Sequence, residues 1–575
     1  MMKLLSYLKP YRIQVILVLV LVFLQSLSEL YLPTLMADIV DHGVVQGDST
    51  HIWRIGAFML LVTLIGGACA VGASYWASKS ASGCARDLRS RVFGHVERFS
   101  LEEFDRIGTA SLITRTTNDI TQVLSVMTMM MRVIVMAPMM CIGGIIMAAS
   151  KDAPLSIVII AVVPALALFI AIVFRKGGPL FRAMQTKLDH LGLVLREQLT
   201  GIRVIRSFNR NEYESERFDK ANLDLTDTSI RVNRLMAFMM PVVLLVMNVA
   251  SLAIIWFGGI RIENGQMQVG ELIAFIQYAW QIMFALVFAS MMLTMIPRAV
   301  ASWNRIREVL DMEPSLTDNG ASAQATAGKP SVEFRNVTFR YPGAEMAALE
   351  QVSFTAEAGK MTAIIGGTGS GKSTLMNLIP RFYDVSDGQV LLGGVNVRDM
   401  KQESLRERIG LVPQKALLFT GTVADNIRYG KQAATDEEIR HAASVAQAAD
   451  FIGELEGEYE AIISQGGGNL SGGQKQRLSI ARALVRRPDV YVFDDSFSAL
   501  DYKTDARLRQ ALRNETNGAA VLVVAQRIST VMDADRIVVL DNGRIAGIGT
   551  HRELLQSCEV YREIALSQLS EEEIA

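Results

Sequence analysis

Gly366 to Thr374 read GGTGSGKST and follow the apolar run Met361 to Ile365, which predicts a buried strand that ends in a glycine-rich loop. The spacing fits GxxxxGK[ST] in its required context of strand, loop and helix. Glycines allow backbone N–H groups to curl around phosphate oxygens without interference from a Cβ atom, and the helix that follows presents its positive end. The stretch therefore predicts a phosphate-binding loop rather than a plain glycine-rich turn.

A second apolar run, Val490 to Phe493, predicts a parallel strand that ends at Asp494. This carboxylate is the expected partner, through water, of a Mg²⁺ ion that the Ser373 hydroxyl would ligate, while Lys372 would reach the β- and γ-phosphates. Between the two strands, Leu470 to Gln474 read LSGGQ directly before a helical pattern. Such a turn offers backbone N–H groups and a serine hydroxyl to a second phosphate, from a nucleotide held outside this chain.

With these motifs the chain resembles the exporters of the ATP-binding cassette (ABC) family, in the half-transporter form, over nearly its whole length. It resembles in particular the degenerate-site subunit of bacterial heterodimeric multidrug exporters. The resemblance implies a domain of six transmembrane helices followed by an α/β P-loop nucleotide-binding domain. It also implies that two such chains sandwich two ATP molecules with Mg²⁺, each site combining one chain's phosphate loop with the other's LSGGQ.

The resemblance also implies roles for individual residues. Tyr341, in FRYPG, would stack on adenine, and Gln414, in LVPQK, would sense Mg²⁺ and contact the membrane domain. The residues expected to bind this chain's own ATP are Gly367, Thr368, Gly369, Ser370, Gly371, Lys372, Ser373 and Thr374. Those expected to contact the partner's ATP are Leu470, Ser471, Gly472, Gly473 and Gln474. The loop expected to act across the dimer is Ser498, Ala499, Leu500 and Asp501. The expected Mg²⁺ site is Ser373, Gln414 and, through water, Asp494.

Three positions depart from the family pattern. The residue after the Mg²⁺ aspartate is normally a glutamate that polarises the attacking water, and here it is Asp495. A side chain shorter by one methylene withdraws the carboxylate by more than about 1 Å, and such a misplacement costs roughly a hundredfold in rate. Gln526 replaces the switch histidine and carries no titratable proton near neutral pH. The segment Ser464 to Asn469, SQGGGN, lacks the glutamate and arginine common there.

Asp495 and Gln526 serve the site built on this chain's Lys372, whereas LSGGQ serves the site built on the partner's phosphate loop. We therefore expect a heterodimer whose partner has an intact catalytic glutamate and switch histidine and a degenerate signature. The alternative is a homodimeric lipid or drug flippase in which both sites hydrolyse ATP slowly. A third hypothesis is an ATP-gated channel or sensor. It ranks last, because the sequence shows no long regulatory insert.

Half of the residues are hydrophobic, and they concentrate before about Pro297, which predicts a membrane domain. The two long polar connections, Lys79 to Val126 and Arg175 to Leu235, are rich in arginine and should face the cytosol together with the N-terminus and the ATPase domain. Such a multi-pass protein would lie in a bacterial cytoplasmic membrane. The six expected spans are Ile13 to Leu35, Ile55 to Ala77, Met127 to Ala149, Leu155 to Phe174, Met236 to Ile260 and Leu272 to Ile296.

Domain boundaries follow from composition. We expect a transmembrane domain at 1–310 with an N-terminal elbow helix within Met1 to Arg12, a flexible linker at 311–330, and the nucleotide-binding domain at 331–575 with an acidic tail. By resemblance, short coupling helices should lie near Leu101 to Thr109 and Gly201 to Glu212. Four dispersed cysteines indicate free thiols, and a net charge of −1 gives no support to nucleic-acid binding.

The sequence features that bear on the substrate are methionines and acidic residues in or near the spans. The 28 methionines include runs in the spans, and unbranched thioethers can adapt to hydrophobic or amphipathic compounds and lipids, although any one of them more often packs helices. Glu29 lies inside the first span, where a carboxylate suggests recognition of cationic compounds or a pairing across helices, or it lies near the outer interface. Asp38 and Asp41, near the outer mouth, either contribute to a closing gate or are solvated.

Overall fold

A computed structural model describes residues 7–318 and 330–569, apart from the side chains of 293 and 294. The chain forms two compact units: Met1–Glu97 with Ala110–Met312, and Arg98–Thr109 with Glu313–Ala575. Part of the expected elbow helix, most of the expected linker and the acidic tail lie outside the described residues. The predicted domain boundaries stay predictions, but Arg98–Thr109 belongs to the second unit although it interrupts the first in sequence.

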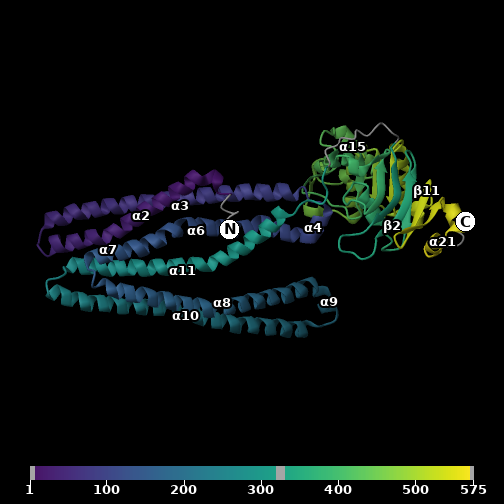
Figure 1. Cartoon of the computed structure of the whole chain (residues 1–575). Coiled ribbons are helices and arrows are strands. Elements are labelled where there is room, and N and C mark those ends of the chain that lie inside the picture. The colour runs from purple at the N-terminus through teal and green to yellow at the C-terminus, as the bar shows by residue number, and fades with distance from the viewer. Residues whose placement is uncertain (1–6, 319–329, 570–575) are drawn as a thin grey trace. The chain divides into compact units, whose positions relative to one another are not determined.

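Among the described residues, the first unit contains six long helical stretches that are apolar enough to cross a membrane, and each overlaps one of the six predicted spans and extends beyond it. In Figure 1, α2 runs beside α3 and α8 runs beside α10. These helices are far longer than a bilayer requires. The 53 residues of α10 extend over about 80 Å at ~1.5 Å per residue, against a hydrocarbon core of about 30 Å.

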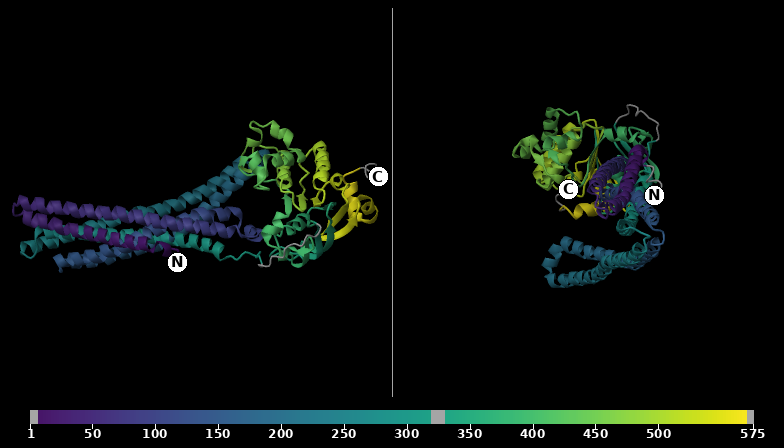
Figure 2. Two further views of the ribbon diagram at one scale, coloured as in Figure 1. Left: turned by 90° about the horizontal axis from the view of Figure 1, so that it is seen from above. Right: turned by 90° about the vertical axis from the view of Figure 1, so that its left-hand side faces the viewer.

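The helices of the first unit have the following bounds: α2 Arg12–Asp38, the π-helical turn η2 Ile39–Val44, α3 Ser49–Val96, α5 Thr109–Thr114, η3 Arg115–Asp119, α6 Ile120–Pro138, η4 Met139–Gly143, α7 Gly144–Lys151, α8 Ser156–Thr200, α9 Ile202–Ser207, α10 Asn211–Glu263 and α11 Val269–Asp311. A short 3₁₀ turn, η1 at Lys9–Tyr11, precedes α2. Figure 2 shows these long helices from two further directions.

Close helix packing in this unit depends on small residues. A Cβ atom at Gly143 would lie 2.5 Å from the Leu30 side chain, and one at Gly144 would lie 2.7 Å from Ile282. The Tyr278 hydroxyl donates to the Leu30 carbonyl oxygen (3.0 Å), so α11 is tied to α2 inside the core. Met247 and Met283 are fully buried in the same core, which places these two methionines in helix packing.

The second unit is an α/β domain with three sheets. A six-stranded sheet has the order β12-β11-β3-β10-β9-β6, a four-stranded antiparallel sheet has the order β2-β1-β4-β5, and β7 pairs with β8. The strands are β1 Val332–Phe339, β2 Leu349–Ala356, β3 Met361–Gly366, β4 Asp387–Leu392, β5 Val395–Asn396, β6 Ile409–Val412, β7 Gly421–Thr422, β8 Ile462–Ile463, β9 Val490–Asp494, β10 Ala520–Val524, β11 Arg536–Asp541 and β12 Arg544–Gly549. The predicted fold, six apolar helices followed by an α/β nucleotide-binding domain, is confirmed.

The helices of this unit surround the sheets. They are α4 Leu101–Ile107, α12 Lys372–Leu378, α13 Gln402–Glu407, α14 Val423–Arg428, α15 Asp436–Val445, α16 Ala449–Gly453, α17 Gly472–Leu484, α18 Tyr502–Glu515, α19 Ile528–Val531, α20 His551–Ser557 and α21 Glu559–Leu566. Short 3₁₀ turns, η5 Val397–Asp399, η6 Glu458–Glu460 and η7 Gln465–Gly467, connect them to the strands. All four cysteines are free, as predicted, and only Cys141 is not fully buried.

Parallel pairing of four strands brings the predicted site together. β3, β10, β9 and β6 pair in parallel, so their carboxyl ends meet at one edge of the sheet. Ligands of such sheets bind in the crevice outside the carboxyl ends of the strands. The phosphate loop follows β3, Asp495 follows β9, Gln526 follows β10 by two residues, and Gln414 follows β6 by two residues.

Candidate functional site

The loop after β3 is curled around the Lys372 ammonium group. Gly369 and Gly371 adopt φ of +83° and +99°, a region that favours glycine, and a Cβ atom at 371 would also lie 2.7 Å from the Ala348 carbonyl oxygen. Lys372 Nζ donates to the carbonyl oxygens of Gly366 (2.9 Å) and Gly367 (2.6 Å). Its ammonium group is therefore held inside the curve of the loop, where a phosphate would lie.

The charged groups of this loop are partly removed from water. Burial lowers the pKa of Lys372, and burial raises the pKa of Asp494 although a hydrogen bond from Ser373 opposes it. Charges in such surroundings interact more strongly with a charged ligand than they would in bulk water. The Ser373 hydroxyl is exposed beside the Asp494 carboxylate. These hard oxygen donors fit Mg²⁺, which keeps several waters and takes few protein ligands.

Asp495 is held by two amide groups of its own chain. Its Oδ2 atom accepts from Gln414 Nε2 (3.2 Å) and from Gln526 Nε2 (3.0 Å). The residue is buried, and its backbone has φ of +46°, a conformation that aspartate adopts more readily than most residues. The side chain of Gln568 donates in turn to the Gln526 carbonyl oxygen (2.8 Å). The three positions predicted from separate motifs therefore form one hydrogen-bonded cluster.

Tyr341 belongs to a cluster of three aromatic rings. Its ring lies edge-on to Phe339 (centroids 4.8 Å apart) and to Tyr383 (5.5 Å). Its hydroxyl lies 3.0 Å from the Thr374 hydroxyl, which ties the tyrosine to the end of the phosphate loop. The ring is half-buried beside the loop, a position compatible with the adenine-stacking role that the resemblance implies, and this role stays a prediction.

The LSGGQ segment opens α17 on the surface. Ser471 caps the helix: its hydroxyl accepts from the Gln474 N–H (3.3 Å), and the Gln474 side chain accepts from the Ser471 N–H (2.8 Å). A Cβ atom at Gly472 would meet nothing within 4 Å, and the residue is exposed. Nothing in the described chain therefore requires glycine at 472. A Cβ atom at Gly473 would lie 3.1 Å from the Ala499 carbonyl oxygen.

The loop Ser498 to Asp501 connects Asp495 to α18. The Ser498 hydroxyl donates to the Asp495 carbonyl oxygen (2.9 Å), and Arg527 donates to the Ser498 carbonyl oxygen (3.0 Å). Asp501 caps α18 by accepting from the Thr504 N–H (2.9 Å), a bond that lowers the pKa of this carboxyl. Ser498 and Ala499 are exposed between these anchors, as a loop that meets a second chain would be.

The unusual SQGGGN segment forms a closed turn. The Ser464 N–H and hydroxyl both donate to Asn469 Oδ1 (3.0 Å each), and Asn469 Nδ2 donates to the Ile462 carbonyl oxygen (3.0 Å). Gly466 and Gly467 have φ of +65° and +67°. Serine, asparagine and glycine therefore build the turn without the glutamate and arginine that the family pattern has there.

The first predicted coupling helix is present as α4 and is bonded within the second unit. Glu103 accepts from the Ser315 N–H (2.9 Å), and the Ser100 hydroxyl lies 2.9 Å from that of Ser315. Burial raises the pKa of Glu103, but hydrogen bonds from Ser100 and Ser315 outweigh burial and hold the pKa below its usual value. Tyr383 donates its hydroxyl to Asp105 (2.9 Å), a contact that no sequence motif indicated.

Tyr383 therefore connects the aromatic cluster around Tyr341 to the helix α4. It contacts Tyr341 through its ring and α4 through its hydroxyl, and both burial and the bond to Asp105 raise its pKa.

The second predicted coupling helix is present as α9, in the first unit, and none of its residues is buried in the described chain.

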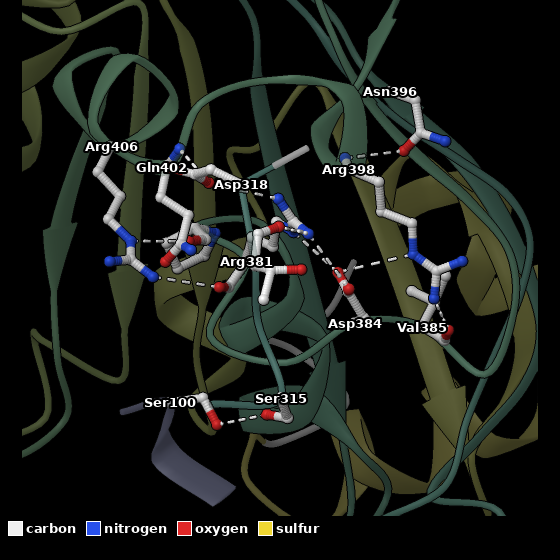
Figure 3. A network of polar contacts seen from close by, with 12 residues as sticks. Ser100, Ser315, Asp318, Arg381, Asp384, Val385, Asn396, Arg398, Gln402 and Arg406 are labelled. Carbon is white, nitrogen blue, oxygen red and sulfur yellow. Dashed lines mark hydrogen bonds and ion pairs between the residues drawn. The ribbon is translucent and has the colours of Figure 1, made fainter. Parts of the chain in front are cut away.

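A buried arginine fastens the segment that precedes the α/β core. Arg381 is 3% exposed and donates to Asp384 (2.9 Å) and to the Thr317 carbonyl oxygen (3.4 Å). Figure 3 shows it between Asp318 and Asp384, with Arg406 donating to the Arg381 carbonyl oxygen (3.2 Å). No motif indicated this network, because a single arginine in an apolar stretch gives no signal of its partners.

The two candidate residues of the membrane unit differ. Glu29 is half-buried, accepts from Gln25 Nε2 (2.8 Å), and its carbonyl oxygen accepts from Gln281 (3.1 Å). Asp41 is buried and accepts from the Gly270 N–H (2.6 Å), at the start of α11. Asp41 is therefore a helix anchor, so the alternative that it is solvated is wrong, and its role in a gate stays a prediction.

Comparison with known proteins places the chain in a family. Residues 15–286 match the ABC transporter transmembrane region, and residues 349–498 match the ABC transporter domain. An uncharacterized ABC transporter ATP-binding protein of Mycobacterium tuberculosis is 46% identical over 98% of this chain and 97% of that protein. A putative multidrug export ATP-binding/permease protein of Bacillus subtilis is 32% identical over 98% of each chain.

A lipid flippase and a solved exporter are also similar to the chain. An ATP-dependent lipid A-core flippase of Vibrio parahaemolyticus is 30% identical over 98% of this chain and 97% of the flippase. A solved structure of a bacterial Atm1-family ABC exporter with ATP bound is 26% identical, has a TM-score of 0.80, and is matched over 97% of this chain and 99% of that chain. The chain is a multi-pass membrane protein of the ABC transporter family, with the architecture of an ATP-driven exporter half-transporter.

Proposed function

We propose that this chain is one subunit of a heterodimeric ABC exporter that extrudes hydrophobic or amphipathic compounds. In this proposal it retains ATP at its own site and completes the partner's hydrolytic site. The observation that supports the proposal best is the position of Asp495, whose Oδ2 atom accepts hydrogen bonds from Gln414 and Gln526 of the same chain. The single methylene of aspartate keeps the carboxylate beside these amides.

The cluster explains why hydrolysis at this site would be slow. A general base must lie within hydrogen-bonding reach of the water that it activates. Two amide donors already occupy one oxygen of Asp495. Gln526 cannot act as an acid or base, because its amide does not titrate near neutral pH. This site would therefore hold ATP through Lys372 and the loop glycines, with Mg²⁺ on Ser373 and Asp494, and turn it over slowly.

The signature segment would serve a second nucleotide. Ser471 and Gly472 are exposed, and the open space at Gly472 leaves room for a phosphate to approach the backbone N–H groups of α17. The partner would provide the phosphate loop, a glutamate base and a switch histidine. ATP binding at both sites would close the two nucleotide-binding domains, and hydrolysis at the partner's site would open them again.

We further propose that the membrane domain spans 1–310, that 311–330 links it to the nucleotide-binding domain at 331–575, and that this domain and the N-terminus face the cytosol of a bacterium. Arginine-rich connections support this orientation by the positive-inside rule. Membrane lipids would surround the six spans.

A homodimeric flippase is the second candidate, because a relative named as a lipid A-core flippase is 30% identical over nearly the whole chain.

Expression of the chain alone and together with a second half-transporter of the same genome tests this proposal. We expect the chain alone to hydrolyse ATP roughly a hundredfold more slowly than the pair, because the misplaced base would act in every site of a homodimer. Purified samples in nanodiscs give the rate per dimer, and size-exclusion chromatography gives the assembly state. A homodimer as fast as the pair would favour the flippase alternative.

The contact between Tyr383 and Asp105 predicts a coupling defect. We expect Tyr383→Phe to reduce the compound transported per ATP hydrolysed, because the ring beside Tyr341 remains but the bond to α4 is lost. A hydrogen bond to a charged acceptor is worth about 1.5–3 kcal/mol. Asp105→Asn removes the same charged acceptor. If the two residues act through this bond, the double variant is no worse than the more severe single variant, whereas additive losses would contradict the link.

A further inference from the structure

Two of the chain's six histidines lie together with a carboxylate where the first helical hairpin turns. Asp38 ends α2, His42 lies in η2, and His51 lies in the first turn of α3. His42 Nδ1 lies 2.8 Å from Asp38 Oδ1, and His51 Nε2 lies 3.4 Å from Asp38 Oδ2. One ligand atom from each of the three side chains can be chosen so that all lie within 4.8 Å of one another.

We propose that Asp38, His42 and His51 bind a divalent transition-metal ion of the zinc class. Imidazole nitrogen and carboxylate oxygen are ligands that zinc accepts, at about 2.0–2.2 Å from the metal in tetrahedral geometry. That geometry places ligand atoms roughly 3.3 Å apart. The two separations from Asp38, 2.8 and 3.4 Å, bracket this value, and all three ligand atoms lie within 4.8 Å of one another. Three protein ligands leave the fourth position for water.

His51 gives independent support. Its Nε2 atom is shielded from solvent and makes no hydrogen bond of good geometry within the described residues. A shielded ring nitrogen that lies 3.4 Å from a carboxylate oxygen without a hydrogen bond is poorly satisfied. A metal ion between the two atoms would satisfy both.

The backbone around the cluster is fixed by other contacts. Asp48 caps α3 by accepting from the His51 N–H (3.0 Å), which sets the first turn of that helix. Asp41 accepts from the Gly270 N–H (2.6 Å), which holds η2 against α11. Neither carboxylate belongs to the cluster, so these two contacts can hold the backbone around the ligands whether or not a metal is bound. A bound ion would join the end of α2 to the start of α3 across their connecting turn.

Metal binding by the purified full-length protein, freed of any histidine tag, tests this site. Equilibrium dialysis against Zn²⁺ should show one more bound ion per chain in the wild type than in His42→Ala or His51→Ala. Cobalt(II) should give the visible absorption of a four- or five-coordinate site in the wild type only. His190→Ala is the matched control, because His190 is exposed on α8 and outside the cluster, and it should bind as the wild type does.

Other outcomes would overturn the proposal. Equal zinc binding by the wild type and both histidine variants, or no binding by the wild type at micromolar metal, would show that Asp38 serves only as a hydrogen-bond partner of His42 and an ion-pair partner of His51. Thermal unfolding without metal checks that the variants fold. If an alanine variant is unfolded, Asp38→Asn decides instead, because it preserves the size of the side chain and removes the anionic ligand. It should bind Zn²⁺ at least about tenfold more weakly.

Discussion

In the assembled dimer, Gly472→Asp removes nearly all ATP hydrolysis, roughly a hundredfold or more, whereas Asp495→Asn leaves most of it. This asymmetry is expected because the two residues serve different sites. A carboxylate at 472 would project from the start of α17 toward the phosphate of the partner's nucleotide, where like charges repel. Asparagine at 495 removes a base that already contributes little, and the other site continues to turn over.

The surroundings of Gly472 make this comparison informative. A Cβ atom there would meet nothing within 4 Å, so the substitution should not disturb the fold of the chain. Gly453, at the end of α16, is also exposed and also has open space around a Cβ atom. Gly453→Asp is therefore the matched control and should hydrolyse ATP as the wild type does. The rate of ATP hydrolysis by the purified pair in nanodiscs gives the measurement.

The result separates the two candidate functions. In a homodimer each site contains both Asp495 and LSGGQ, so Asp495→Asn and Gly472→Asp should reduce the rate by similar factors. Equal losses would contradict the assignment of Asp495 to a site that mainly retains ATP. A normal rate in Gly472→Asp would show that the exposed LSGGQ segment contacts no nucleotide.

Much of the candidate site follows from the order of motifs along the chain. The phosphate loop, Asp495 and Gln526 each follow an apolar run, and these runs form the parallel strands β3, β9 and β10, whose carboxyl ends meet. The family resemblance assigns Asp495 and Gln526 to the site of Lys372, and the structure places the three residues at one edge of the sheet. The hydrogen bonds from Gln414 and Gln526 to one oxygen of Asp495 could not be anticipated, because they depend on side-chain rotations.

Hydrogen bonds between polar residues far apart in the chain also could not be predicted from the sequence. The sequence left open whether Asp41 contributes to a gate or is solvated, and it gave no sign that the N–H of Gly270, 229 residues later, donates to its carboxylate. Tyr383 has no motif, and its partner Asp105 is 278 residues away. Periodicity reveals which face of a helix is buried but says nothing about which polar groups meet inside the fold.

The converse experiment restores the two missing groups. We expect Asp495→Glu combined with Gln526→His to raise ATP hydrolysis about a hundredfold in a tandem fusion of two copies of this chain. The fusion holds the copies together, so each site combines a phosphate loop with an intact LSGGQ. The extra methylene of glutamate carries the carboxylate past the two amides that hold Asp495, and histidine removes one of those amides.

Each single substitution should recover less than the pair. Gln526→His alone leaves the shorter carboxylate bonded to Gln414, and Asp495→Glu alone leaves a neutral amide at the switch position. Glutamate also tolerates the φ of +46° at 495 less well than aspartate, a local cost of about 1 kcal/mol that a small fall in melting temperature should reveal. If the wild-type fusion already hydrolyses ATP as fast as the double variant, aspartate is an adequate base, and the retention of ATP at this site would need another cause.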